Sequence, residues 1–136
     1  MIKLFSSIIL ALFFAGCGAE DKQACPQCHM AIEEGSPYIC SSGKLHFDEF
    51  GCMVLYADKN GLDLASLMVK TKDTLKAIPA TKAYYSRVDK TPMSYGFAAY
   101  EETKEGFVSF DEAQKMMLRG EHMANPKIKK QLLGDR

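Results

Sequence analysis

The sequence feature that most constrains the fold of this chain is a group of cysteines placed close together. Of its five cysteines, Cys25, Cys28, Cys40 and Cys52 lie in one part of the sequence, and none follows in the remaining residues. Disulfides that stabilise a whole small domain would be spread more evenly along the chain. The clustering therefore favours a local site built from thiols, with one or two structural disulfides as the alternative.

The first sixteen residues, MIKLFSSIILALFFAG, have the pattern of a secretory signal: one early charge, an apolar run and two small residues. The run is shorter than the roughly 20 residues that span a bilayer. Cys17 follows directly, and a cysteine at this position resembles the lipobox of bacterial lipoproteins. We expect a signal peptide over 1–16, lipidation at Cys17 and a polar tether over 17–24. An ordinary cleaved signal that leaves a free Cys17 is the alternative.

Charge and length narrow the class of protein. Seventeen basic and seventeen acidic residues balance, so the chain has no general electrostatic field for nucleic acid, and no nucleic-acid partner is expected. Residues 17–136 are enough for one small domain.

The first half of this domain is predicted as two strands, a helix and a strand. Residues 36–41 and 44–48 are rich in β-forming side chains and flank a turn that contains Gly43, which indicates a hairpin. Asp48 is expected to cap a helix over 49–59, because apolar residues recur there at helical spacing. A further strand is expected over 67–72.

The second half is interpreted as a repeat of that order. Strands are expected over 82–88, 95–100 and 107–110, and Asp111 is expected to cap a helix that ends near Arg119. The prediction is an α+β fold in which two small ββαβ units, about 25–73 and 80–120, pack as one domain over 25–120. Residues 121–136 are predicted to be a loose polar tail.

The segment Cys25-Pro26-Gln27-Cys28-His29-Met30 carries the most chemistry. Thiolate and thioether sulfurs are soft ligands, and together they select Cu(I) over harder ions. In an extended segment, residues two apart point to the same side, so Cys28 and Met30 could bind one ion while His29 points elsewhere.

Two other interpretations of this segment stay open. A Cys-x-x-Cys pair can be a redox dithiol, although Gly35-Ser36-Pro37 follows too soon for the helix that such motifs open. A structural zinc site could use Cys25, Cys28, Cys40 and Cys52. Cys40 and Cys52 are otherwise expected to be small buried hydrophobic residues.

Three motifs together resemble the NosL family of copper-binding accessory lipoproteins for nitrous oxide reductase. They are CPQCHM at 25–30, HFDEFGCM at 46–53 and TPMSYGFAAY at 91–100, and the resemblance extends from about Cys17 to about Arg119. It implies two ββαβ units, similar to the metal-handling part of organomercurial lyase. It also implies that Cys28 and Met30 are the family's Cys-x-Met pair and that Met93 is a further sulfur ligand.

This chain departs from the family pattern at two positions. His29 stands where the family usually has glycine, so an imidazole could join the metal ligands. Asp48 stands where related zinc-binding or heavy-metal-binding sequences of the YHS type have a cysteine, which argues against a closed four-cysteine zinc site. His122 and Met123 are a weaker auxiliary pair.

The resemblance implies an envelope lipoprotein, anchored by its lipid and facing the periplasm. It would bind Cu(I) and deliver it to a copper enzyme, with nitrous oxide reductase as the expected acceptor and a membrane copper exporter or assembly transporter as a further expected partner. The candidate ligands are Cys28, Met30, Met93, Cys25 and His29. No enzymatic activity is expected; the rival hypotheses are a zinc- or disulfide-stabilised envelope protein, or a thiol-dependent enzyme using Cys28, Cys52 and Asp48.

Overall fold

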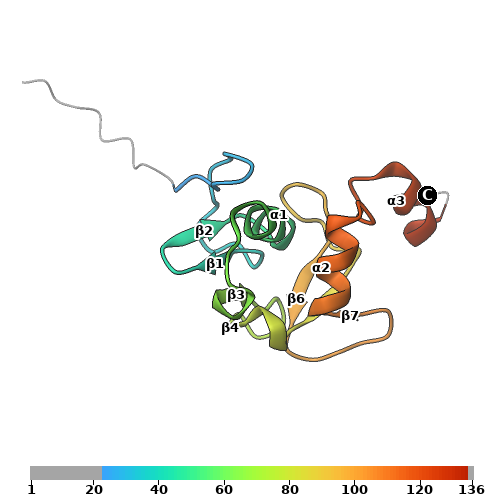
Figure 1. Ribbon diagram of the computed structural model, residues 1–136. Helices are drawn as coiled ribbons and strands as arrows, with labels where there is room; N and C mark the ends of the chain where they lie inside the picture. The colour runs from blue at the N-terminus through green and yellow to red at the C-terminus, as the bar shows by residue number, and fades with distance from the viewer. Residues whose placement is uncertain (1–22, 135–136) are drawn as a thin grey trace, which may run out of the picture.

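The computed structural model describes residues 23–134, so the expected signal peptide, Cys17 and most of the tether lie outside the described residues. Within that range there is no helix with the length and apolar character of a membrane span. The described chain is a mixed α+β structure with two small antiparallel sheets, which confirms the predicted class (Figure 1).

The first sheet has the strand order β2-β1-β3-β4, with every neighbouring pair antiparallel. Gly43 has φ +58° and makes the turn between β1 and β2, so the hairpin lies where the sequence predicts it, with shorter strands. The last strand, at the edge of the sheet, was not predicted. The strands are β1 (Cys40–Ser42), β2 (Leu45–Phe47), β3 (Leu67–Lys70) and β4 (Ala77–Pro79).

The second sheet has the order β6-β5-β7, and its last strand leads directly into a helix. The chain order in this half is three strands and then α2, and within residues 23–134 no strand follows α2. The second half of the described chain therefore does not have the predicted order ββαβ. The elements are β5 (Tyr84–Ser86), β6 (Ala98–Tyr100), β7 (Val108–Ser109) and α2 (Phe110–Leu118).

The N-termini of both helices differ from the predicted caps. Helix α1 (Phe50–Asn60) has Glu49 as its N-cap residue, so Asp48 is not the cap and its side chain is available elsewhere. Ser109, rather than Asp111, caps α2 through its hydroxyl, which accepts the Glu112 N–H at 3.3 Å. The predicted stop of α1 is confirmed, since Gly61 adopts φ +65° there.

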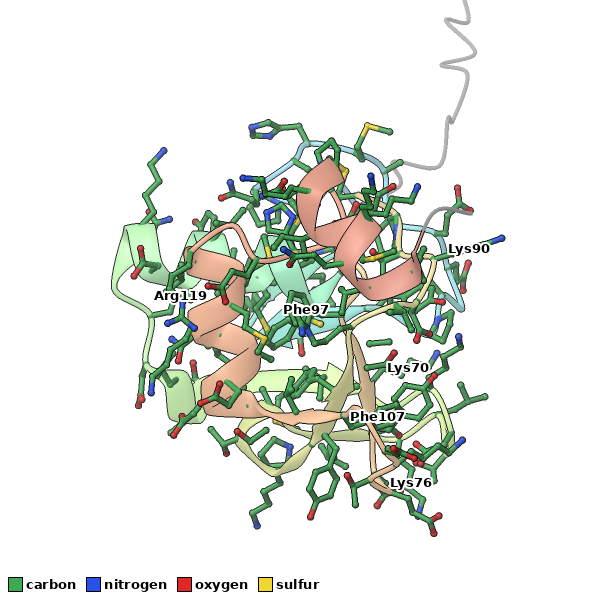
Figure 2. The ribbon with its side chains drawn as sticks, turned by 90° about the vertical axis from the view of Figure 1, so that its right-hand side faces the viewer. Lys70, Lys76, Lys90, Phe97, Phe107 and Arg119 are labelled. Atoms are coloured by element: carbon green, nitrogen blue, oxygen red, sulfur yellow. The ribbon has the colours of Figure 1, made fainter. Side chains whose placement is uncertain are left out.

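One apolar core joins the two halves. Phe50 of α1 packs against Tyr85 of β5, Phe97 and Phe110 of α2, with ring centroids 4.4, 5.7 and 6.1 Å away. All four rings are buried. Figure 2 shows Phe97 near the centre of the view, whereas Lys76 lies at the periphery.

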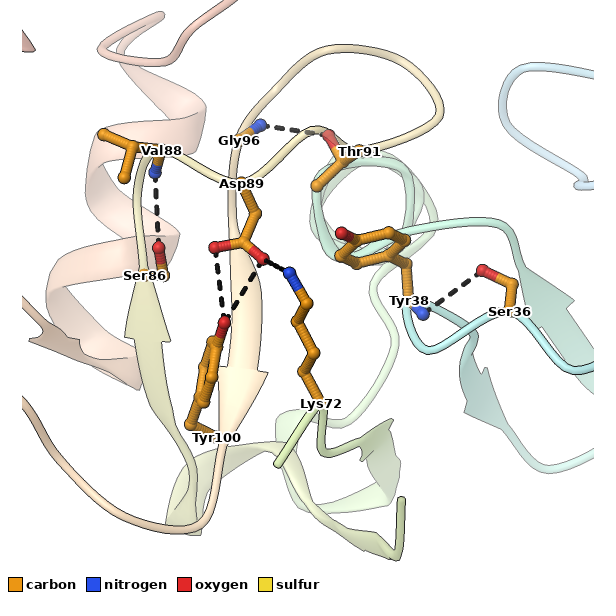
Figure 3. A network of polar contacts seen from close by, with 9 residues as sticks. All are labelled: Ser36, Tyr38, Lys72, Ser86, Val88, Asp89, Thr91, Gly96 and Tyr100. Atoms are coloured by element: carbon orange, nitrogen blue, oxygen red, sulfur yellow. Dashed lines mark hydrogen bonds and ion pairs between the residues drawn. The ribbon is translucent and has the colours of Figure 1, made fainter. Parts of the chain in front are cut away.

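A polar network also ties the first half to the second (Figure 3). Lys72, just after β3, forms an ion pair with Asp89, and the Tyr100 hydroxyl donates to the same carboxylate at 3.3 Å. The backbone N–H of Lys72 donates to the carbonyl of Ala99 in β6 at 2.8 Å. These contacts hold the end of β3 beside β6.

The C-terminal segment is not the loose tail that its polarity predicts. It contains α3 (Pro126–Leu133), which Asn125 caps by accepting the Lys127 N–H at 3.1 Å. Before this helix, the N–H of Met123 donates to the carbonyl of Tyr95 at 3.0 Å. The segment is therefore held against the loop between β5 and β6.

Candidate metal centre

The segment Cys25–Met30 folds into a tight turn that places its two thiols together. The N–H of His29 donates to the carbonyl of Cys25 at 2.8 Å, and the N–H of Cys25 donates to the carbonyl of Met30 at 2.9 Å. His29 has φ +64°, a conformation that glycine adopts more readily. Histidine thus occupies a backbone position that favours glycine.

The junction between β2 and α1 supplies two more donors. Asp48 directly follows β2, and Cys52 lies in the first turn of α1, four residues later. The N-terminus of a helix carries a partial positive charge, which favours a thiolate or carboxylate nearby. Residues far apart in sequence therefore converge on the turn before β1.

Four side chains form what we call the thiol–carboxylate cluster: Cys25, Cys28, Asp48 and Cys52. One ligand atom from each, three sulfurs and one carboxylate oxygen, all lie within 4.8 Å of one another. Cys25 and Cys52 are fully buried, Asp48 is 4% exposed and Cys28 is half-buried. These residues could bind a metal ion, with Cys28 nearest to solvent.

Hydrogen bonds make Cys25 the most acidic thiol of the cluster. The Cys52 thiol donates to the Cys25 sulfur, and this contact is the largest of the causes that together lower the pKa of Cys25 to about 6, although burial opposes them. The backbone N–H groups of Cys28, Asp48 and Gln27 point at the same sulfur and contribute to this lowering of the pKa. Cys25 is thus the thiol of the cluster that loses its proton most readily.

The other two thiols keep their protons when no metal is bound. The pKa of Cys28 is raised to about 11, chiefly by burial and also by the hydrogen bond that its S–H donates to Asp48 Oδ2 at 3.2 Å. The pKa of Cys52 is raised because it donates to Cys25 and because it is buried. A metal ion bound by all three sulfurs would displace these two protons.

The Met30 backbone N–H donates to the Cys28 sulfur, while the Met30 side chain lies at the surface. This side chain is 58% exposed, and His29 is exposed as well. The alternation of side chains holds for extended backbone, whereas the left-handed conformation at His29 turns the chain after Cys28. In this arrangement both residues lie at the surface next to the cluster.

Met93 is held near the cluster by its backbone. Its N–H donates to Oε2 of the fully buried Glu49 at 2.7 Å, and Glu49 is adjacent to Asp48. The Met93 side chain is partly buried against the core. The loop that contains Met93 is thus attached to the N-cap residue of α1.

Cys40 is not one of the four donors, although the four-cysteine zinc hypothesis included it. It is buried in β1, and its S–H donates to the carbonyl of Tyr38 at 3.4 Å. Asp48 completes the cluster instead. The four cysteines within residues 23–134 are all free thiols in the structure.

Sequence reasoning did not name Asp48 as a metal ligand and grouped it with Cys28 and Cys52 only for the rival enzyme hypothesis. It named Cys52 as a ligand only in the four-cysteine zinc alternative and otherwise expected a buried hydrophobic residue. The signal was the spacing of Asp48 and Cys52, four residues apart across a strand-to-helix junction, which brings both side chains to one helix N-terminus. Comparison of the chain with protein-family models, with curated proteins and with solved structures finds no match.

Proposed function

We propose that this protein binds a thiophilic metal ion at the thiol–carboxylate cluster and that its physiological cargo is Cu(I). The observation that carries the proposal is the convergence of three sulfurs and one carboxylate oxygen within 4.8 Å. Sulfur ligands favour Cu(I), and thiolates are strong ligands only once deprotonated. Cys25, whose pKa is lowered, is the thiol that most readily supplies the first ligand.

Access to the cluster supports carriage in preference to permanent storage. Cys28 is half-buried, and the exposed Met30 and His29 follow it in the same turn. A partner could contact this side and exchange ligands with a bound ion, one sulfur at a time. In this scheme the thioether sulfurs of Met30 and Met93 bind Cu(I) while the ion enters or leaves the cluster.

The cellular role that we propose follows the resemblance to NosL proteins. The chain would be anchored through Cys17, face the periplasm and pass Cu(I) to a copper enzyme, with nitrous oxide reductase as the acceptor. It would act as a metallochaperone and not as an enzyme. The tight turn and the β2–α1 junction would then serve as the two sides of a metal-transfer site.

A second candidate is a structural zinc protein, and Asp48 is the observation that favours it. Three thiolates and a carboxylate make a complete tetrahedral set for Zn²⁺, which accepts sulfur and oxygen ligands alike. Such an ion would join the turn at 25–30 to α1 and would stabilise the fold. Removal of any ion that binds only the folded state lowers the free energy of unfolding, but a structural zinc ion differs in that the chain without it does not fold stably.

Titration with Cu(I) against a competing chelator tests the proposal. We expect Cys28→Ala and Cys52→Ala each to weaken Cu(I) binding by at least about tenfold, because each removes a direct ligand. Loss of a residue that only hydrogen-bonds to a ligand already weakens metal binding by about that factor. Cys40→Ala is the matched control, since it removes a buried thiol outside the cluster. Equal affinities of the two cluster variants and the control would overturn the assignment.

A further arm tests the thioether ligands of the transfer scheme. Met30→Ala and Met93→Ala are expected to change the rate at which Cu(I) passes to the chelator more than the equilibrium affinity. Unfolding measured with and without Zn²⁺ tests the second candidate, the structural zinc protein, which requires Zn²⁺ for a stable fold.

A further inference from the structure

Asp48 occupies an unusual environment for a carboxylate. Its side chain is 4% exposed, and no ion pair between described residues includes it. Oδ2 accepts the Cys28 S–H, while Oδ1 is buried and has no hydrogen-bond partner among the described residues. Buried carboxylate oxygens without partners are uncommon, because their desolvation is costly.

The carboxylate of Asp48 lies among the three thiols of the cluster. One of its oxygens lies within 4.8 Å of the sulfurs of Cys25, Cys28 and Cys52. The residue is not the N-cap of α1, so the helix does not require its side chain. A cation at the centre of the cluster would provide the partner that the protein itself does not.

Carboxylate oxygen is a hard donor, and the other three donors are soft. Zn²⁺ takes both kinds in a four-coordinate tetrahedron. Cu(I) is selected by sulfur and gains little from a carboxylate. The three sulfurs can therefore bind either Cu(I) or Zn²⁺, whereas the Asp48 carboxylate contributes to the binding of Zn²⁺.

We infer that Asp48 is the metal-specificity residue of the cluster, which adds a fourth ligand for Zn²⁺ and leaves Cu(I) to the three sulfurs. This inference rests on the proposed metal binding at the same site. The protein would accept Zn²⁺ because of Asp48, and replacement of this one side chain would shift its preference toward Cu(I).

Affinities of the full-length protein for Zn²⁺ and for Cu(I), each measured against a competing chelator, test this. Asp48→Asn preserves the size of the side chain and an acceptor for Cys28 but removes the charge. We expect its Zn²⁺ affinity to fall by at least about tenfold, while its Cu(I) affinity stays within about threefold of the wild type. Asp48→Cys restores a charged donor and should recover Zn²⁺ binding.

Bound Co²⁺ gives a second readout, because its visible absorption reports tetrahedral coordination by thiolates. The spectrum should saturate at a lower Co²⁺ concentration in the wild type and in Asp48→Cys than in Asp48→Asn, where a water replaces the fourth protein ligand. A parallel loss of both affinities in Asp48→Asn, or an unchanged Zn²⁺ affinity, would overturn the inference. If the wild type binds neither ion, the proposed function itself fails, which is a different result. Should Asp48→Asn not fold, a Zn²⁺ affinity of Asp48→Cys far below that of the wild type would refute the inference.

Discussion

The carboxyl group of Glu49 is fully buried at the start of α1, next to the thiol–carboxylate cluster. Oε2 accepts the N–H of Met93 at 2.7 Å, and Oε1 is buried without a hydrogen-bond partner among the described residues. Burial is the largest influence on this group and raises its pKa from 4.5 to about 7. Its ionisation should therefore control the stability of the metal-free protein.

The direction of this effect follows from proton binding. Between pH 4.5 and about 7, the folded protein holds a proton on Glu49 that the unfolded chain has lost. The stabilisation that accompanies the neutral form is complete below pH 4.5 and is lost as the pH rises through 7. A pKa shift of this size corresponds to roughly 3 kcal/mol of unfolding free energy.

Glu49→Gln removes the ionisation and preserves an acceptor for the Met93 N–H. We expect the free energy of unfolding of the variant, relative to the wild type, to rise by roughly 3 kcal/mol between about pH 4.5 and about pH 8. The measurement is urea unfolding at both pH values with a chelator and a thiol reductant present. Glu34→Gln is the control, because Glu34 is exposed. A difference between Glu49→Gln and wild type that does not change with pH would refute the reasoning.

Three further substitutions probe the fold. In Gly51→Ala, the new Cβ would lie 2.4 Å from Tyr95 Cδ2, so overpacking of about 1–3 kcal/mol should outweigh a helix-propensity gain of about 1 kcal/mol. Urea unfolding should show a net loss, and a net gain would contradict the predicted clash. Tyr85→Phe removes the hydroxyl that donates to the carbonyl of Ala80 at 2.6 Å, and should cost about 1–3 kcal/mol by thermal unfolding; no loss would contradict this. Asn125→Ala should destabilise α3 locally by about 1 kcal/mol, seen as faster amide hydrogen exchange in that helix with global stability unchanged. Unchanged exchange would show that the cap contributes little.

Local sequence signals predicted those elements whose formation depends on nearby residues. The hairpin at Gly43 and the end of α1 at Gly61 both rely on a glycine with positive φ, and both lie where expected. The strand β4 was not predicted; it is only three residues long and ends in Pro79. Its position at the sheet edge explains why a residue without an N–H is tolerated there.

The C-terminal helix was missed for a different reason. The segment from Glu121 is polar and basic, which suggested a tail, yet Asn125 followed by Pro126 is a strong helix-start signal. Local capping outweighed composition in this case. No residue of α3 is buried, so apolar periodicity gave little indication of it.

The sequence by itself determined which kinds of donor this protein has and placed two of them, Cys25 and Cys28, in one turn. Tertiary structure alone decided the rest of the cluster. Packing of α1 onto the sheet brings Asp48 and Cys52 to that turn and leaves Cys40 in β1, bonded to a backbone carbonyl. The physical reason is that a ligand set depends on where side chains of distant segments point. That direction follows from one backbone angle at His29 and from the residue at which α1 begins.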